Sequence, residues 1–150
     1  SRPGGERLNA DLAAFHARHG APASLLLEII FDVASFPDSP PFVRVVAPRC
    51  EWYTGHVTAG GSVCVSALVP GPGPDRWRPE YRVAAILEMI KWQMVDVERV
   101  EVRTRFGPGG TAGPLRVDLE GKWHRGGCER AYSEGEARAA FERSRANHGW

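Results

Sequence analysis

The sequence has almost no net charge and no long hydrophobic run, and these two absences exclude several classes of protein. Its 150 residues include 19 Lys and Arg against 18 Asp and Glu, so summed charge does not attract nucleic acid or an anionic membrane surface. The longest apolar run, SLLLEII at residues 24–30, is too short to span a bilayer and contains Glu28. The first residues lack the charged and apolar pattern of a signal peptide. We therefore expect a cytoplasmic or nuclear protein whose partners include no nucleic acid and no membrane.

Cysteine is also scarce. The three cysteines, Cys50, Cys64 and Cys128, are odd in number and far apart, which argues against a framework of disulfides. With His56 and His124 they make five possible zinc ligands, but no C-x-x-C or H-x-x-x-H spacing groups them. The spacing predicts no metal site, and at least one free thiol needs an explanation.

The pattern of apolar residues predicts one α+β domain over residues 1–150, with strands first and helices last. Leu8, Leu12 and Phe15 have helical spacing and are followed by Gly20, which is typical of a helix end. Residues 24–32 and 42–48 are rich in apolar and β-branched residues, which predicts two strands.

The second half of the chain has a less regular pattern. A helix is predicted from Pro79 to about Met94, whereas residues 97–106 fit either a strand or the tail of that helix. Proline and glycine predict loops at 70–74 and 107–114. Near the end, Ser133 stands three residues before Glu136, the spacing of a capping box, and predicts a helix that runs to Gly149 with Phe141 on its inner face.

Cys64 follows the glycine pair Gly60 and Gly61 and precedes small apolar residues. This predicts a thiol at the edge of a strand, beside a loop. Such a thiol is a nucleophile in its thiolate form. Cysteine also behaves as a small buried hydrophobe, so plain packing is the alternative. The flanking residues leave both interpretations open.

Three elements taken together resemble the ubiquitin-conjugating enzymes, most closely their Q-type branch. The family has a Phe/Tyr-Pro-x-x-Pro-Pro element before a strand, then Gly-Ser/Ala-x-Cys, then Trp with Ser/Arg-Pro at the start of a helix. The matching residues are Phe36, Pro37, Pro40 and Pro41, then Gly61, Ser62 and Cys64, then Trp77 and Pro79. The closing residues 131–150 also look like the Q-type terminus. The resemblance covers residues 24–150 and leaves 1–23 as a variable lead-in.

The resemblance implies a UBC-like fold, in which helices flank an antiparallel sheet, and a transferase that needs no cofactor. Cys64 matches the cysteine that carries ubiquitin, or a ubiquitin-like protein, as a thioester and passes it to an acceptor nucleophile. The implied partners are ubiquitin, a ubiquitin-activating enzyme, a ubiquitin ligase and a protein substrate.

Two alternatives stay open. One is a non-catalytic module with this fold that binds ubiquitin or acts as a scaffold, in which Cys64 only packs. The other is a cysteine hydrolase that pairs Cys64 with His56, although no residue is evident as the orienting acid. An exposed Cys64 sulfur favours the transferase, and a buried one favours the module.

The sequence departs from most of the family upstream of the cysteine. The usual His-Pro-Asn is replaced by TGHVT at residues 54–58, so the Asn is absent, as it also is in the Q-type and J-type branches. We expect backbone N–H groups around Gly60, Gly61 and Cys64 to stabilise the oxyanion. His56 is then either a candidate catalytic group or a surface histidine of the loop.

Two further departures concern length. The link VPGPGPD at residues 69–75 is longer than usual and is either a flap over the thiol or a solvated insertion. The usual N-terminal helix and first strand are expected to be missing, because residues 6–20 look like the variable Q-type link. A trimmed fragment and a diverged start both account for this.

Overall fold

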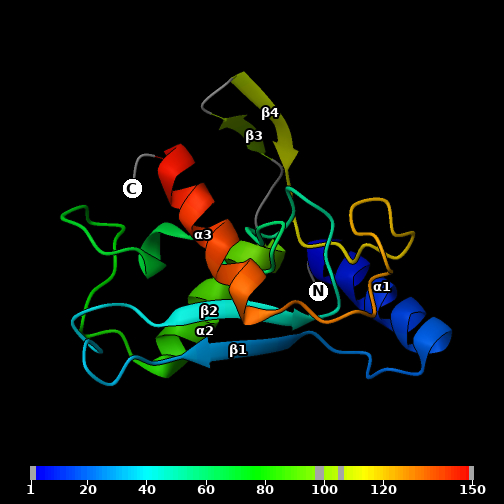
Figure 1. The fold of residues 1–150 in the computed structure, drawn as a ribbon, viewed down its shortest axis with the longest axis horizontal. Helices are drawn as coiled ribbons and strands as arrows, with labels where there is room; N and C mark the ends of the chain where they lie inside the picture. Colours follow the sequence, from blue (N-terminus) through cyan, green and yellow to red (C-terminus); the bar gives the residue numbers. More distant parts are fainter. Residues whose placement is uncertain (1–2, 97–99, 105–106, 149–150) are drawn as a thin grey trace.

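The computed structural model describes residues 3–96, 100–104 and 107–148 and confirms the α+β class. Figure 1 shows helices packed around a two-stranded sheet, with a second hairpin set apart from it. None of the described helices is both long enough and apolar enough to cross a bilayer. The elements, in chain order, are α1 (Pro3–His19), β1 (Leu26–Ile30), β2 (Phe42–Ala47), the 3₁₀ helix η1 (Ser66–Leu68), α2 (Val83–Lys91), the π-helical η2 (Trp92–Asp96), β3 (Val100–Thr104), β4 (Gly107–Ala112) and α3 (Glu134–His148).

The sheet of β1 and β2 confirms the two strands predicted from β-branched residues. The strands are antiparallel, with Glu28 opposite Arg44, and these two side chains form an ion pair of 2.8 Å. Val43, Arg44 and Val45 are all buried, so both faces of β2 are covered. Arg44 tolerates this burial because its guanidinium also donates to the carbonyl oxygen of Tyr132 at 3.0 Å.

The N-terminal helix α1 confirms the helix predicted from the spacing of Leu8, Leu12 and Phe15, all three of which are buried. It ends where Gly20 adopts a φ of +67° and donates its N–H to the carbonyl of His16. Asp11 accepts two hydrogen bonds from Arg116, which tie α1 to a segment far along the chain. The structure therefore has a packed helix in the part of the chain where the usual first helix was expected to be missing, and that expectation is not confirmed.

The hairpin of β3 and β4 corrects the loop predicted for residues 107–114. Residues Gly107–Ala112 form a strand that pairs antiparallel with β3. Proline and glycine lowered the expected strand propensity, but backbone pairing needs no side chain, and in a two-stranded ribbon Pro108 lies on an edge. Of the uncertain segment 97–106, residues 100–104 are strand, and the others lie outside the described residues.

The two later helices follow the sequence prediction with shifted ends. The helix expected from Pro79 begins as α2 at Val83 and continues through η2 to Asp96. The capping box is confirmed, because Ser133 Oγ accepts from the N–H of Glu136 at 3.1 Å and the Glu136 carboxylate accepts from the N–H of Ser133 at 2.9 Å. The predicted stop at Gly149 lies outside the described residues. Phe141 packs edge-on against Phe42, which places α3 on β2 (Figure 1).

Candidate active site

The segment before Cys64 is a tight turn between residues 57 and 63. Val57 and Val63 form an isolated antiparallel bridge, and the hydroxyls of Thr58 and Ser62 lie 2.6 Å apart inside the turn. Gly61 has a φ of +95°, and a Cβ there would lie 2.6 Å from the Tyr132 ring, so glycine is required at this position. The chain then leaves the bridge and enters η1 two residues after Cys64. Cys64 therefore lies between a bridge and a 3₁₀ helix, and not on the regular strand that was predicted.

Cys64 is buried beneath the C-terminal half of α3. Its residue is 8% exposed, and its Sγ lies 3.0 Å from the hydroxyl of Ser144. Burial raises the pKa of the Cys64 thiol, while the Ser144 hydrogen bond and the charge of Arg145 act in the opposite direction. The element that covers the thiol is thus α3. The 69–75 link is largely exposed beyond Val69, as expected for a solvated insertion, although Pro70 reaches the neighbouring cavity.

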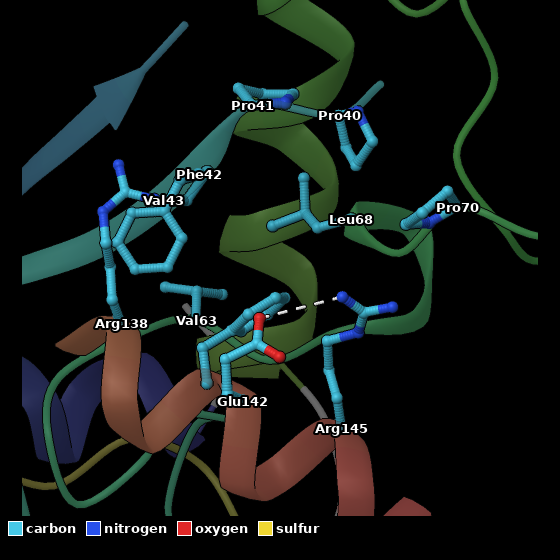
Figure 2. Close-up of a pocket in the computed structure, with 11 residues that line it drawn as sticks. Pro40, Pro41, Phe42, Val43, Val63, Leu68, Pro70, Arg138, Glu142 and Arg145 are labelled. Carbon is cyan, nitrogen blue, oxygen red and sulfur yellow. Dashed lines mark ion pairs between the residues drawn. The ribbon is translucent and has the colours of Figure 1, made fainter. Parts of the chain in front are cut away.

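A cavity of about 370 Å³ lies between the start of β2, η1 and α3 (Figure 2), and Cys64 is not among the residues that line it. Its floor is apolar, and Val63, immediately before Cys64, lines it. Arg138, Glu142 and Arg145 of α3 form its charged side, where Glu142 and Arg145 are paired at 3.8 Å. The lining residues are Pro40, Pro41, Phe42, Val43, Val63, Leu68, Pro70, Arg138, Phe141, Glu142 and Arg145.

The other two thiols have less favourable surroundings for a thiolate. Burial raises the pKa of Cys50 far above its usual value, and the charge of Asp118 adds to the increase. Burial also raises the pKa of Cys128, and Glu129 adds to it. A cation opposes this increase at two of the three thiols, Arg18 at Cys128 and Arg145 at Cys64, but at Cys64 no acidic neighbour adds to it and the hydrogen bond with Ser144 also opposes it.

His56 is placed next to Cys64 through its backbone. It has a φ of +57°, and its carbonyl accepts the N–H of Cys64 at 2.8 Å. Burial lowers the pKa of the His56 imidazole, and the charge of His148 lowers it further. The structure thus brings together His56, Cys64 and the end of α3, and it gives Ser144 as the polar side chain that contacts the sulfur.

Two of the three N–H groups expected to stabilise an oxyanion, those of Gly61 and Cys64, already donate hydrogen bonds. Gly61 donates to the carbonyl of Thr58, and Cys64 donates to that of His56. Between them, the N–H of Ser62 donates to the Thr58 hydroxyl and that of Val63 to the carbonyl of Val43. An oxyanion could accept from these N–H groups only if their present hydrogen bonds were broken, which costs free energy. The catalytic role of Gly61 therefore stays a prediction.

The three elements that carried the sequence resemblance meet in space. Trp77 donates its indole N–H to the carbonyl of Pro37 at 2.8 Å, and its ring lies 6.2 Å from that of Phe36. Pro40 and Pro41 line the cavity, as Val63 does. The first and third elements therefore hold one side of the site while the second supplies the thiol.

Sequence reasoning missed the contribution of α3. Ser144 is 80 residues from Cys64, and neither it nor Arg145 belongs to a motif, so no spacing pointed to them. The five cysteines and histidines weighed as zinc ligands do not gather into one site within the described residues. His124 instead hydrogen-bonds the carbonyl of Cys50 at 2.9 Å.

Sequence comparison finds several relatives that are named ubiquitin-conjugating enzymes. No protein-family model matches the chain. The human and mouse proteins named ubiquitin-conjugating enzyme E2 Q-like protein 1 are each 37% identical to it over 71 residues, which cover 47% of this chain and 40% of theirs. Human ubiquitin-conjugating enzyme E2 Q1 is 31% identical over 100 residues, which cover 67% of this chain and 21% of that protein. The chain thus spans less than half the length of these relatives, and it is related in sequence to the Q-type ubiquitin-conjugating enzymes.

Proposed function

We propose that this chain is a ubiquitin-conjugating transferase that carries ubiquitin, or a ubiquitin-like protein, as a thioester on Cys64. The observation that best supports this proposal is the local environment of the Cys64 sulfur, compared with the environments of the Cys50 and Cys128 sulfurs. Its sulfur lies 3.0 Å from the Ser144 hydroxyl, the charge of Arg145 favours its thiolate, and the preceding residue, Val63, lines a cavity. The names of the relatives supply the reaction class.

The proposed reaction has two acyl transfers. The Cys64 thiolate attacks the C-terminal carbonyl of ubiquitin, which an activating enzyme presents as a thioester, and the sulfur of that enzyme leaves as a thiolate. An acceptor on a protein substrate, aided by a ligase, then attacks the same carbonyl, and Cys64 leaves with the electron pair of the C–S bond. A neighbouring hydroxyl and cation favour both steps because each passes through a state in which Cys64 carries negative charge.

The burial of Cys64 sets a condition on this mechanism. Cys64 is only 8% exposed as a residue and its sulfur lies under Ser144, so the end of α3 has to move aside before the C-terminal tail of another protein can reach the thiol. Residues 142–148 are half-buried or exposed, and the ion pair of Glu142 with Arg145 is long, at 3.8 Å. Weak holding of this kind is typical of segments that open locally without global unfolding.

The same burial supports a second candidate. In a non-catalytic ubiquitin-binding module, Cys64 would stay packed under α3, and the hydrogen bond to Ser144 would only satisfy two buried polar groups. The two candidates differ in whether the thiol is ever available.

A charging assay separates them. The chain is incubated with activating enzyme, ATP and ubiquitin and analysed on a non-reducing gel. We expect an adduct that thiol reductant cleaves, its loss in Cys64→Ala, and its replacement by a stable oxyester or nothing in Cys64→Ser. Cys128→Ala is the control and should charge like the parent. If Cys64→Ala charges equally well, or if the parent does not charge under any condition, the transferase proposal is wrong.

Two further variants test the details. Ala146→Pro disrupts the last turn of α3 and should charge faster than the parent, since proline breaks a helix at its own position and disfavours the helical conformation of the preceding residue. His56→Ala should cost little in charging. A loss of about 10²-fold or more, as when an oxyanion donor is removed, would make His56 a catalytic group instead.

A further inference from the structure

Three side chains of metal-binding type meet at the end of α1, away from the residues assigned to the thioester. His19 Nε2 lies 3.8 Å from the Sγ of Cys128 and 3.9 Å from a carboxylate oxygen of Glu129. The three ligand atoms all lie within 4.8 Å of one another. Cys128 is 1% exposed, whereas the side chains of His19 and Glu129 are 27% and 48% exposed. The cluster therefore has a buried sulfur and two ligands that reach it from the surface.

The backbone on both sides brings these groups together. His19 is the last residue of α1, because Gly20 ends the helix with a positive φ. On the other side, Gly126 and Gly127 have φ values of +90° and +91° immediately before Cys128. A Cβ on Gly127 would meet the carboxylate of Glu129, with its Oε1 at 2.6 Å, so glycine at 127 leaves the space that this carboxylate occupies.

We propose that His19, Cys128 and Glu129 form a Zn²⁺ site with a fourth position for water. Thiolate, imidazole and carboxylate are the three ligand types that zinc takes in proteins. With Zn–S of about 2.3 Å and Zn–N and Zn–O of about 2.0–2.2 Å, the ligand atoms of a tetrahedral site with one sulfur lie roughly 3.3–3.7 Å apart. The two His19 contacts, at 3.8 and 3.9 Å, lie beyond this range by a few tenths of an ångström, so rotations of the two more exposed side chains have to close the site.

The bound ion would join two distant parts of the chain. His19 is 109 residues from Cys128, which is why no local spacing predicted the site. Nearby, Arg18 and Glu120 form an exposed ion pair at 3.0 Å that links the same helix to the same region. Zinc would therefore act as a cross-link between the end of α1 and the segment before α3, with a role in stability and not in acyl transfer.

The test is zinc binding to the reduced chain, freed of metal by a chelator and then dialysed, with Zn²⁺ alone as the probe. We expect one ion per chain by equilibrium dialysis and isothermal titration. When the free Zn²⁺ concentration is about a hundred times the Kd, the Tm of the chain should rise by roughly 5–10 °C. With Co²⁺ as a substitute, the absorption spectrum should show a thiolate-to-metal charge-transfer band, which reports the Cys128 ligand directly.

Three variants and their matched controls make the assignment specific. Cys128→Ser, His19→Gln and Glu129→Gln should each weaken zinc binding by about 10²-fold or more, because loss of a ligand costs at least as much as loss of an outer-shell partner. Cys64→Ala, His16→Gln and Glu134→Gln change the same residue types elsewhere and should bind like the parent. Absence of stoichiometric binding in the parent, or parent-like affinity in Cys128→Ser, would overturn the proposal. The readout is metal binding, so failure of the transferase proposal does not affect it.

Discussion

The first half of α3, residues 134–140, and the second half, residues 141–148, are held against the rest of the fold by different contacts. In the first half, Ala137 and Ala140 are buried, and the carboxylate of Glu136 makes two hydrogen bonds, of 2.7 and 3.1 Å, with the guanidinium of Arg49. In the second half no residue of 141–148 is fully buried. Its contacts with the site are the packing of Phe141 on Phe42, the cavity-lining side chains of Glu142 and Arg145, and the hydrogen bond between Ser144 and Cys64.

This difference separates a fixed support from a weakly held cover. Arg49 is itself buried and donates to the carbonyls of Arg130 and Ala131, so the first half is fixed to the strand end through several charged hydrogen bonds. Beyond Phe141, which packs on Phe42, the second half loses no fully buried side chain if it frays. A single helix thus holds the fold at one end and controls access to Cys64 at the other.

Proline substitutions in the two halves of α3 should differ most in their effect on the free energy of unfolding. Ala139 and Ala146 are both exposed, so proline at either position removes no buried side chain. Ala139→Pro should lower the free energy of unfolding by about 3 kcal/mol or more, because it breaks the anchored half, whereas Ala146→Pro should cost less than about 1 kcal/mol. Urea denaturation measures both. Equal losses would show that the two halves are equally anchored.

Alanine substitutions at Gly60 and Gly135 test individual contacts of the first half of α3. A Cβ on Gly60 would meet the carbonyl of Glu136 and lie 2.8 Å from Cβ of Ala140, so Gly60→Ala should push α3 outward and cost about 1–3 kcal/mol. A Cβ on Gly135 meets nothing within 4 Å, and Gly135→Ala in the same helix should stabilise by about 0.5–1 kcal/mol. The comparison fails if both variants change the free energy of unfolding in the same direction.

The ion pair between Glu136 and Arg49, which anchors the first half of α3, should also make the free energy of unfolding depend on pH. Burial raises the pKa of Glu136, but hydrogen bonds from Arg49 and Ser133 outweigh this and bring it down to about 2. A depressed carboxyl pKa contributes stability above the unfolded value near 4.5, and this contribution is lost as pH falls from about 4.5 toward 2. Because the side chain is about a third exposed, solvent screening reduces the contribution to roughly 1–2 kcal/mol.

The measurement is the difference in unfolding free energy between the parent and Glu136→Gln as a function of pH. This difference should shrink across that window. Glu134→Gln, on the exposed face of the same turn, is the control and should show no such trend. A difference that stays constant from about pH 6 to about pH 2.5 would contradict the role of Glu136 as the charged anchor.

Local signals predicted most of the elements, and tertiary contacts decided the rest. The Ser133 and Glu136 spacing, the glycine after α1 and the β-branched residues of β2 each have a local physical cause, and the three elements they predicted were confirmed. The strand β4 was missed because composition favoured a loop, and pairing with β3 outweighed that preference.

The candidate site was harder to predict than the fold. A motif singled out Cys64, but its burial depends on where α3 packs, and no local pattern in Ser144 or Arg145 encodes that. The convergence of His19 with Cys128 depends in the same way on the docking of α1.

The smallest expected effect tests whether the second half of α3 is a cover or an activator of the thiol. The hydrogen bond between Ser144 and Cys64 should contribute about 0.5–1.5 kcal/mol to the covered state. Ser144→Ala should therefore open the site more often and speed alkylation of Cys64 by iodoacetamide about 2–10-fold, as located by mass spectrometry. Ser66→Ala, a half-buried serine two residues from Cys64, is the matched control and should react at the parent rate. Slower alkylation in Ser144→Ala would mean that the hydrogen-bonded thiol is the reactive form, so that this end of α3 activates Cys64 and does not shield it.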